Sequence, residues 1–243
     1  MLKKYALPGL LVGSLMASSS FAATILPGSE KSLQDILDEI TVGGPSSVNV
    51  HTDQLANDQY WSISASGGAI STFIFEITAN AGSQAFGIYD YANPNNMVEL
   101  FSGSDTTASQ VKVSILADYS VWVDNELKGN FKDNLFGFFL SNSEVTRYSD
   151  TDLNGGIDYF VAYQGGRGDI VQLPGYGNHP GYAPGEWTAN EFILAFEDGD
   201  DFDYQDLVVM VESVTPRAVP EPATLALLGL GMLGFGLSRR KSA

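Results

Sequence analysis

The sequence predicts an all-β protein: an antiparallel β-sandwich or jelly-roll-like domain with one short N-terminal helix, followed by a hydrophobic helix at the C-terminus. Two observations predict this fold class. Short apolar segments rich in β-branched and aromatic residues recur along the chain, and Gly, Asn, Asp and Ser separate them. Of the 243 residues, 44% are hydrophobic, which is enough apolar surface to bury a core.

The first element of the domain is predicted to be a helix. Apolar residues recur there at the spacing of one helical face, at Leu33, Ile36, Leu37 and Ile40, and Gly-Gly-Pro at residues 43–45 ends the pattern. Strands are predicted after it at residues 60–65, 70–77, 86–89, 97–101, 110–116, 120–123, 135–140, 159–163, 192–196 and 207–211. The last of these is apolar on both faces, which is typical of a central strand that is covered on both sides.

The composition excludes several function classes. Acidic residues outnumber basic ones by 29 to 12, which gives a formal net charge of −17. Nucleic acid is excluded as a partner because phosphate binding needs patches of Lys and Arg. The chain has no Cys, so disulfides, thiolate zinc sites and thiol catalysis are excluded as well.

Residues 1–22 are predicted to be a secretory signal peptide. Lys3 and Lys4 form a basic start, and a short apolar stretch follows them. Small residues at the end of this stretch place the cleavage point between Ala22 and Ala23. Because the apolar stretch is too short to span about 30 Å of hydrocarbon, an uncleaved anchor is disfavoured. We expect residues 23–216 to be exported as the β-sandwich domain.

Residues 217–243 form a tail with three parts. A Val-Pro-Glu-Pro segment comes first, an apolar stretch at residues 223–237 follows, and a basic cluster comes last. The apolar stretch and the basic cluster predict a transmembrane helix whose basic end stays in the cytoplasm. The residues that define the pattern outside the apolar stretch are Val219, Pro220, Glu221, Pro222, Arg239, Arg240 and Lys241.

This tail resembles the PEP-CTERM sorting signal of Gram-negative bacteria. The order of the three parts, their spacing and the terminal basic cluster agree with that signal over about the last 25 residues. The resemblance implies two partners, the secretion machinery and an exosortase that cuts near Pro-Glu-Pro. It also implies that the C-terminus anchors the protein in the membrane transiently, before the protein reaches the cell surface or the extracellular matrix.

The most informative segment is the acidic loop at residues 197–206, which connects two predicted strands. Six of its ten residues are acidic, and residues 168–216 contain no Lys or Arg. Like charges roughly 5–6 Å apart repel by about 3 kcal/mol at an effective dielectric constant near 20. Clustered carboxylates suit Ca2+, which accepts irregular coordination from a loop. The sequence therefore predicts a Ca2+ site or, alternatively, a solvated hairpin tip; the candidate ligands are Glu197, Asp198, Asp201, Asp203 and Asp206.

A second acidic loop begins at Asp150 and reads Asp-Thr-Asp-Leu-Asn-Gly-Gly-Ile-Asp. Asp150, Asp152 and Asn154 have the spacing of the first ligands in a calcium loop, with Gly155 at the sharp turn. Val161, however, stands where such a loop needs a bidentate acid. This loop is predicted either to add oxygen ligands to a cation site or to be an Asp/Asn/Gly turn between strands.

Several short segments between residues 137 and 213 together resemble the sequence pattern of a known domain family. They include Tyr-Ser-Asp at 148–150, Val-Ala-Tyr-Gln at 161–164, and Phe-Glu-Asp at 196–198 followed by Asp-Phe-Asp-Tyr-Gln-Asp at 201–206. This region resembles the bacterial surface domain of unknown function 4114. Gln205 stands where that family has Asn, and the glycine stretch after Asp198 is shortened. The resemblance implies ion binding or enzymatic activity in the acidic segment.

These observations predict a non-enzymatic protein of the cell envelope or matrix, in which Ca2+ stabilises the fold and supports adhesion or contact with exopolysaccharide. The alternative is a carbohydrate-active module. As a glycoside hydrolase, it would use Glu197 as the acid and Asp203 as its partner. As a lectin, it would stack sugars on the aromatic side chains of Tyr176, Tyr182 and Trp187. Alternatively, these three side chains simply pack over the domain.

Overall fold

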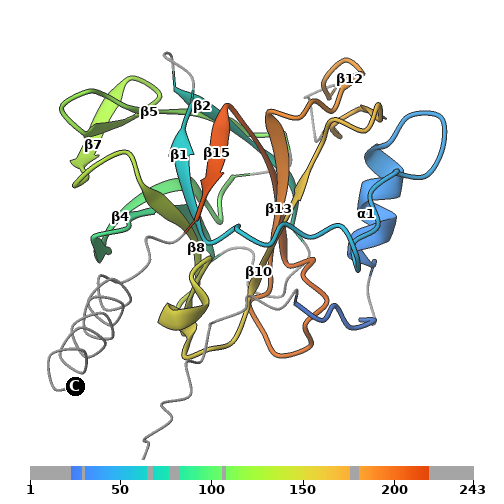
Figure 1. Ribbon diagram of the computed structural model, residues 1–243, viewed down its shortest axis with the longest axis horizontal. Coiled ribbons are helices and arrows are strands. Elements are labelled where there is room, and N and C mark those ends of the chain that lie inside the picture. The colour runs from blue at the N-terminus through green and yellow to red at the C-terminus, as the bar shows by residue number, and fades with distance from the viewer. Residues whose placement is uncertain are drawn as a thin grey trace, which may run out of the picture.

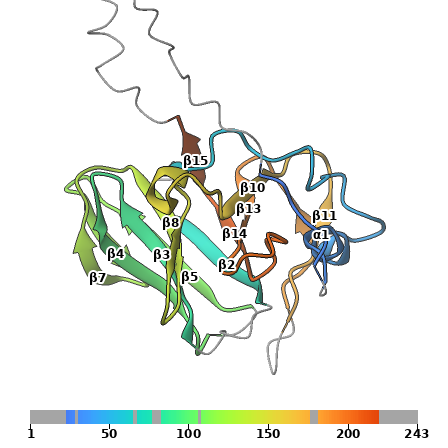
Figure 2. The same cartoon turned by 90° about the horizontal axis from the view of Figure 1, so that it is seen from below.

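The computed structural model describes residues 23–28, 31–64, 68–76, 83–105, 108–175 and 181–218. Across these residues, two large antiparallel β-sheets pack face to face, and a short helix covers the outer face of one sheet (Figures 1 and 2). This architecture confirms the predicted fold class in its broad form. The jelly-roll-like order of connections stays a prediction.

Within the described residues, the first sheet has six strands in the order β15-β1-β8-β3-β4, and β9 pairs with β8. Each strand is antiparallel to its neighbours. Their bounds are β1 (Tyr60–Ile63), β3 (Ala85–Asp90), β4 (Asn93–Ser102), β8 (Phe136–Ser141), β9 (Thr146–Tyr148) and β15 (Val214–Arg217).

The second sheet, again counted over the described residues, has seven antiparallel strands in the order β10-β13-β14-β2-β5-β6-β7. Their bounds are β2 (Ala69–Glu76), β5 (Gln110–Ile115), β6 (Ser120–Val123), β7 (Glu126–Asn130), β10 (Phe160–Gln164), β13 (Glu191–Phe196) and β14 (Leu207–Glu212). Three smaller elements complete the fold: the 3-10 helix η2 (Thr151–Asn154) and the paired strands β11 (Ile170–Val171) and β12 (Gly185–Glu186).

The main core lies between the two large sheets and is rich in aromatic side chains. The Trp61 ring of β1 lies edge-on to Phe138 of β8, with 5.8 Å between the ring centroids, and to Phe192 of β13 at 5.0 Å. Phe160 of β10 contacts Phe196 of β13 at 4.7 Å. The contact between Trp61 and Phe192 joins the first sheet to the second, and because each ring buries a large apolar area, it helps to fix the two sheets relative to each other.

Helix α1 (Leu33–Ile40) covers the outer face of the second sheet, where a second core forms. The Ser32 hydroxyl oxygen caps the helix by accepting a hydrogen bond from the Asp35 N–H at 3.1 Å. The predicted apolar face of the helix is buried with residues of β10, β13 and β14. β13 and β14 are therefore buried on both faces, which confirms the prediction for residues 207–211.

All ten predicted strands are present, with differences of up to four residues at their ends. The sequence analysis missed β7, β9, β11, β12 and β15. β7 is mostly exposed, so it lacks the alternation of buried and exposed residues that marks a strand. β15 contains Pro216, which suits an edge strand such as this one. β12 lies within residues 173–186, a stretch for which no strand was predicted.

Both predicted targeting segments lie outside the described residues, including Ala22, residues 223–237 and the sorting residues from Val219 onward. Ala23 is described, and its carbonyl oxygen accepts a hydrogen bond from Gln54 Nε2 at 3.0 Å. Among the described residues, no helix combines the length and apolar character that a membrane crossing requires. The division of the chain at residues 22 and 216 stays a prediction.

Candidate cation site

The acidic loop at residues 197–206 connects the paired ends of β13 and β14. Phe196 and Leu207 are directly opposite each other in this pair, so both ends of the loop are fixed side by side. Four acidic side chains of the loop each place one oxygen within 4.8 Å of the others: Glu197, Asp201, Asp203 and Asp206. Of the residues that the structure describes, these form the one acidic group that could hold a metal ion.

Glu197 follows β13 directly and has no exposed surface. Its carboxylate accepts hydrogen bonds from three backbone N–H groups of the loop. Oε1 accepts from Gly199 at 2.7 Å, and Oε2 accepts from Asp203 at 3.0 Å and from Tyr204 at 3.4 Å. The loop is therefore wrapped around this buried carboxylate, which replaces the backbone partners that a strand would supply.

Asp206 closes the loop from its other end. Its Oδ2 accepts a hydrogen bond from the Asp198 N–H at 2.7 Å. The Asp206 side chain is 9% exposed and that of Asp203 is 2% exposed, whereas Asp201 is exposed. Solvent therefore reaches the cluster on the side of Asp201, and the other three carboxylates lie below the surface.

Two bulky residues on either side of Asp203 adopt left-handed backbone conformations. The φ angle is 56° at Phe202 and 58° at Tyr204, a region that is unfavourable for large side chains and persists only where contacts impose it. The Phe202 ring stacks on Tyr159 at 5.6 Å, and the Tyr204 hydroxyl donates to the Asp158 carbonyl oxygen at 2.6 Å. These contacts hold the backbone in the conformation that buries the Asp203 carboxylate.

The N-terminal segment at residues 23–28 lies against the acidic loop (Figure 1). The Leu26 N–H donates to the Phe202 carbonyl oxygen at 2.8 Å. Gly28 approaches Asp203 so closely that an added Cβ atom would lie 1.9 Å from its Oδ2. A side chain at position 28 would therefore displace the Asp203 carboxylate. No sequence signal indicated this contact, because the two segments are far apart in the chain.

Burial makes the charged state of the cluster unfavourable. It raises the pKa of Glu197, and burial together with the neighbouring charges of Glu197 and Asp198 raises the pKa of Asp206 from 3.8 to about 9. The ion pairs among the described residues involve other carboxylates, so neither Glu197 nor Asp206 has a Lys or Arg partner there. A buried charge needs compensation, and here either a proton shared between Asp206 and Glu197 or a bound cation can supply it.

Asp198, the fifth predicted ligand of this loop, does not belong to the converging group. Its Oδ2 accepts a hydrogen bond from Gln84 Nε2 at 2.7 Å. Gln84 directly precedes β3, so this bond connects the acidic loop to the first sheet. Gln84 is a second supporting residue that the sequence alone did not reveal.

The second acidic loop uses its polar side chains to stabilise a turn. Asp150 caps η2: its Oδ1 accepts from the Asp152 N–H at 2.9 Å, and its Oδ2 accepts from the Tyr60 hydroxyl. The Asn154 side chain bonds to both backbone groups of Tyr148, at 3.0 and 2.7 Å. Asp152 is exposed. This arrangement favours the turn, which was one of the two predictions for these residues.

The aromatic residues proposed for sugar stacking lie in different environments. Trp187 is 1% exposed, and its Nε1 donates to the Glu191 carbonyl oxygen at 3.0 Å, so the stacking prediction is wrong for this residue and the packing alternative is right. Tyr182 is half-buried, and its hydroxyl donates to the Ala108 carbonyl oxygen at 3.0 Å. Tyr176 lies outside the described residues.

The position of Glu197 also argues against glycoside hydrolysis. A general acid must come within hydrogen-bonding distance of the glycosidic oxygen. Glu197 has no exposed surface, and its predicted partner Asp203 is almost fully buried. Both oxygens of Glu197 already accept backbone hydrogen bonds. These two carboxylates are therefore placed to organise the loop and not to contact a polysaccharide.

Residues 218–241 match the family model of the PEP-CTERM protein-sorting motif. The chain therefore carries this motif and is an exported protein that is sorted by an exosortase. The match includes all of the predicted sorting residues: Val219, Pro220, Glu221, Pro222, Arg239, Arg240 and Lys241. This match is confined to the tail. The resemblance of residues 137–213 to domain 4114 therefore stays a prediction. No curated protein matches the chain.

Among solved structures, two bacterial lectins show a distant similarity. The C-terminal domain of the BC2L-C lectin from Burkholderia cenocepacia is 13% identical with a TM-score of 0.29, over 68% of this chain and 99% of that one. The lectin CV2L from Chromobacterium violaceum, solved in complex with α-methyl-fucoside, is 15% identical with a TM-score of 0.28, over 67% and 100%. At TM-scores this low, the similarity supports neither a shared fold nor a shared ligand.

Proposed function

We propose that this exported protein is a non-enzymatic component of the envelope or extracellular matrix of a Gram-negative bacterium, and that Ca2+ bound by the acidic loop stabilises its β-sandwich. The observation that supports the proposal is the converging group of carboxylates, three of them buried. Within the described part of the chain, neither Glu197 nor Asp206 has a basic partner. The stabilised domain would then support adhesion or contact with exopolysaccharide.

The donor set favours Ca2+ over other metal ions. Four carboxylates offer only oxygen atoms, which are the ligands of hard cations. The chain has no Cys and two His, so it lacks the sulfur and nitrogen donors of a typical zinc or copper site. Ca2+ tolerates irregular coordination, whereas Mg2+ requires a near-ideal octahedron that a loop rarely supplies.

A cation at this site would hold together three parts of the domain. Glu197 follows β13, Asp206 precedes β14, and Asp203 contacts the N-terminal segment at Gly28. Because β13 and β14 are buried on both faces, fixing the loop between them supports both cores. An exported chain without cysteines has no disulfide for this purpose, and a bound ion stabilises the folded state by an amount that rises with the logarithm of its concentration relative to its dissociation constant.

The first test is thermal unfolding of the full chain in detergent, with and without Ca2+. At 100 times its dissociation constant, Ca2+ is expected to add about 2.7 kcal/mol to the free energy of unfolding, or roughly 5–10 °C in Tm. Asp203→Ala combined with Asp206→Ala should abolish this rise. Asp200→Ala is the matched control, because Asp200 is exposed in the same loop and outside the converging group. An unchanged Tm in the wild-type chain would refute the proposal.

The second test is the pH dependence of the same site. Without Ca2+, Asp206 has a pKa of about 9 in the folded chain against an ordinary 3.8, so the folded chain binds more protons than the unfolded chain between these values. The contribution of Asp206 to the ion-free stability is therefore fully present below about pH 4 and is lost as the pH rises towards 9. Ca2+ displaces the proton, so its affinity should rise about tenfold per pH unit near neutrality. Calorimetric titration at several pH values measures this slope, and a flat profile would contradict the exchange.

A further inference from the structure

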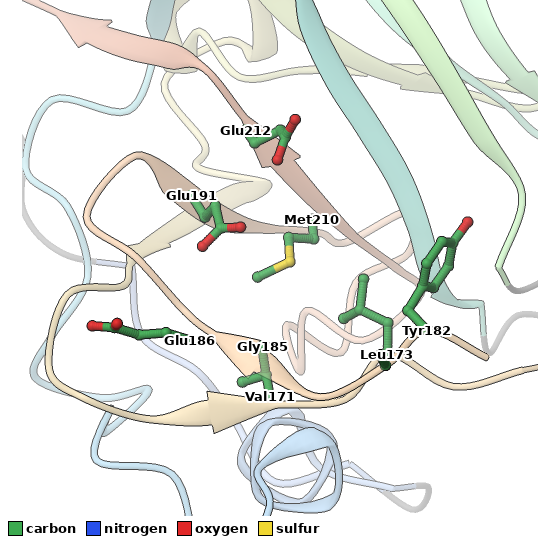
Figure 3. Close-up of a pocket in the computed structure, with 9 residues that line it drawn as sticks. Val171, Leu173, Tyr182, Gly185, Glu186, Glu191, Met210 and Glu212 are labelled. Atoms are coloured by element: carbon green, nitrogen blue, oxygen red, sulfur yellow. The ribbon is translucent and has the colours of Figure 1, made fainter.

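A cavity of about 150 Å3 lies at the opposite end of β13 and β14 from the acidic loop (Figure 3). It opens between these strands and the β11–β12 pair, at the edge of the second core that lies under helix α1. The lining includes the apolar Val171, Leu173 and Met210, the aromatic Tyr182, and three acidic residues, the exposed Glu186 and the half-buried Glu191 and Glu212. In Figure 3, Tyr182 lies on one side of Met210 and Glu191 on the other.

Glu191 and Glu212 are direct cross-strand partners, and both are half-buried. Like charges that face each other across a sheet are destabilising. The ion pairs found among the described residues include neither of them. Glu191 Oε2 accepts a hydrogen bond from the Thr188 N–H at 2.5 Å, which fixes that carboxylate at the edge of the cavity. Two like charges are thus held beside an apolar surface, without a basic side chain of the described chain to offset them.

We propose that this cavity binds the side chain of a lysine from a partner protein. The ammonium group would interact with Glu191 and Glu212 and offset their mutual repulsion. The methylene stem would lie along the apolar floor and against Tyr182, as lysine stems do on apolar surfaces. A water molecule occupies about 30 Å3 of liquid, so the cavity has room for roughly five non-hydrogen atoms, as many as a lysine side chain contains.

The lining favours lysine over two other ligands. A Ca2+ ion needs about six to eight oxygen ligands, whereas one wall and the floor of this cavity are apolar. Among the described residues, the carboxylates that converge closely enough to hold a metal ion are those of the acidic loop, at the other end of β13 and β14. An amino sugar also carries an ammonium group, but its hydroxyl groups would lose their hydrogen bonds to water against an apolar floor.

The test is an NMR titration of the full chain in detergent, labelled with 13C at the methionine methyl groups and saturated with Ca2+. The probe is n-butylammonium, which reproduces the lysine side chain. The Met210 methyl signal, assigned with Met210→Leu, should shift saturably, while that of Met97 on β4 should not. Nα-acetyl-lysine amide should act like the probe, and n-butanol and glucosamine should bind at least about tenfold more weakly. Equal binding of n-butanol or of glucosamine would overturn the proposal.

Glu191→Gln combined with Glu212→Gln should abolish the Met210 shift. Glu144→Gln is the matched control, because Glu144 is exposed in the turn between β8 and β9. Without probe, Glu212→Gln should raise Tm slightly, because it removes a like-charge repulsion. If the double variant does not fold, Glu212→Gln alone should weaken probe binding by about three- to fivefold without lowering Tm. Wild-type binding in that variant, or a lower Tm, would overturn the proposal.

Discussion

The two acidic loops of this protein contain similar residues but use them in opposite ways. In residues 150–158, Asp150 and Asn154 bond to nearby backbone groups and to Tyr60, and they stabilise a turn. In residues 197–206, four carboxylates converge on one another. The spacing of Asp, Asn and Gly alone did not distinguish these outcomes.

The difference follows from the strands that each loop connects. The loop at 197–206 joins β13 to β14, which are paired and buried on both faces, so its ends are close and its side chains turn inward. The loop at 150–158 runs from β9 to β10, which belong to different sheets. A crossing between sheets requires local capping of the backbone, and Asp and Asn side chains supply it.

The largest effect is expected from Glu197→Ala. The substitution leaves three backbone N–H groups, two of them buried, without their acceptor and removes one member of the cation site. We expect a loss of about 3–5 kcal/mol in the free energy of unfolding, and no remaining response to Ca2+. Denaturant unfolding of the full chain with and without Ca2+ measures both quantities.

Glu197→Gln is the milder variant of the same experiment. It keeps one acceptor oxygen but removes the charge, so it should retain more stability than Glu197→Ala while still losing most of the Ca2+ response. If Glu197→Gln responded to Ca2+ like the wild-type chain, Glu197 would support the loop but would not bind the ion.

An intermediate effect is expected from Asp150→Ala in the other loop. The substitution removes the cap of η2 and the acceptor of the Tyr60 hydroxyl, which together should lower the free energy of unfolding by about 1–2 kcal/mol. The Ca2+-induced rise in Tm should be unchanged. Asp152→Ala, at an exposed position of the same turn, should alter stability by less than about 0.5 kcal/mol. A reduced Ca2+ response in either variant would show that the two loops share a site.

Much of the fold was predictable because the relevant signals are local. The apolar face of α1 follows from the spacing of Leu33, Ile36, Leu37 and Ile40, and the ten predicted strands follow from segments of β-branched and aromatic residues. β7 and β15 were missed because exposure and an internal proline hide the alternation that marks a strand. No strand was predicted at residues 173–186, because the two-residue strand β12 exists only through its pairing with β11.

The sequence by itself determined the sorting tail and identified a carboxylate-rich loop, because both are patterns of neighbouring residues. Tertiary structure alone decided which carboxylates converge, that Glu197 is buried, and that Asp198 bonds to Gln84 instead. It also placed Gly28 against Asp203 and Glu212 opposite Glu191. The physical reason is that convergence and burial depend on strand pairing and on contacts between segments far apart in the chain, and a local pattern does not encode either.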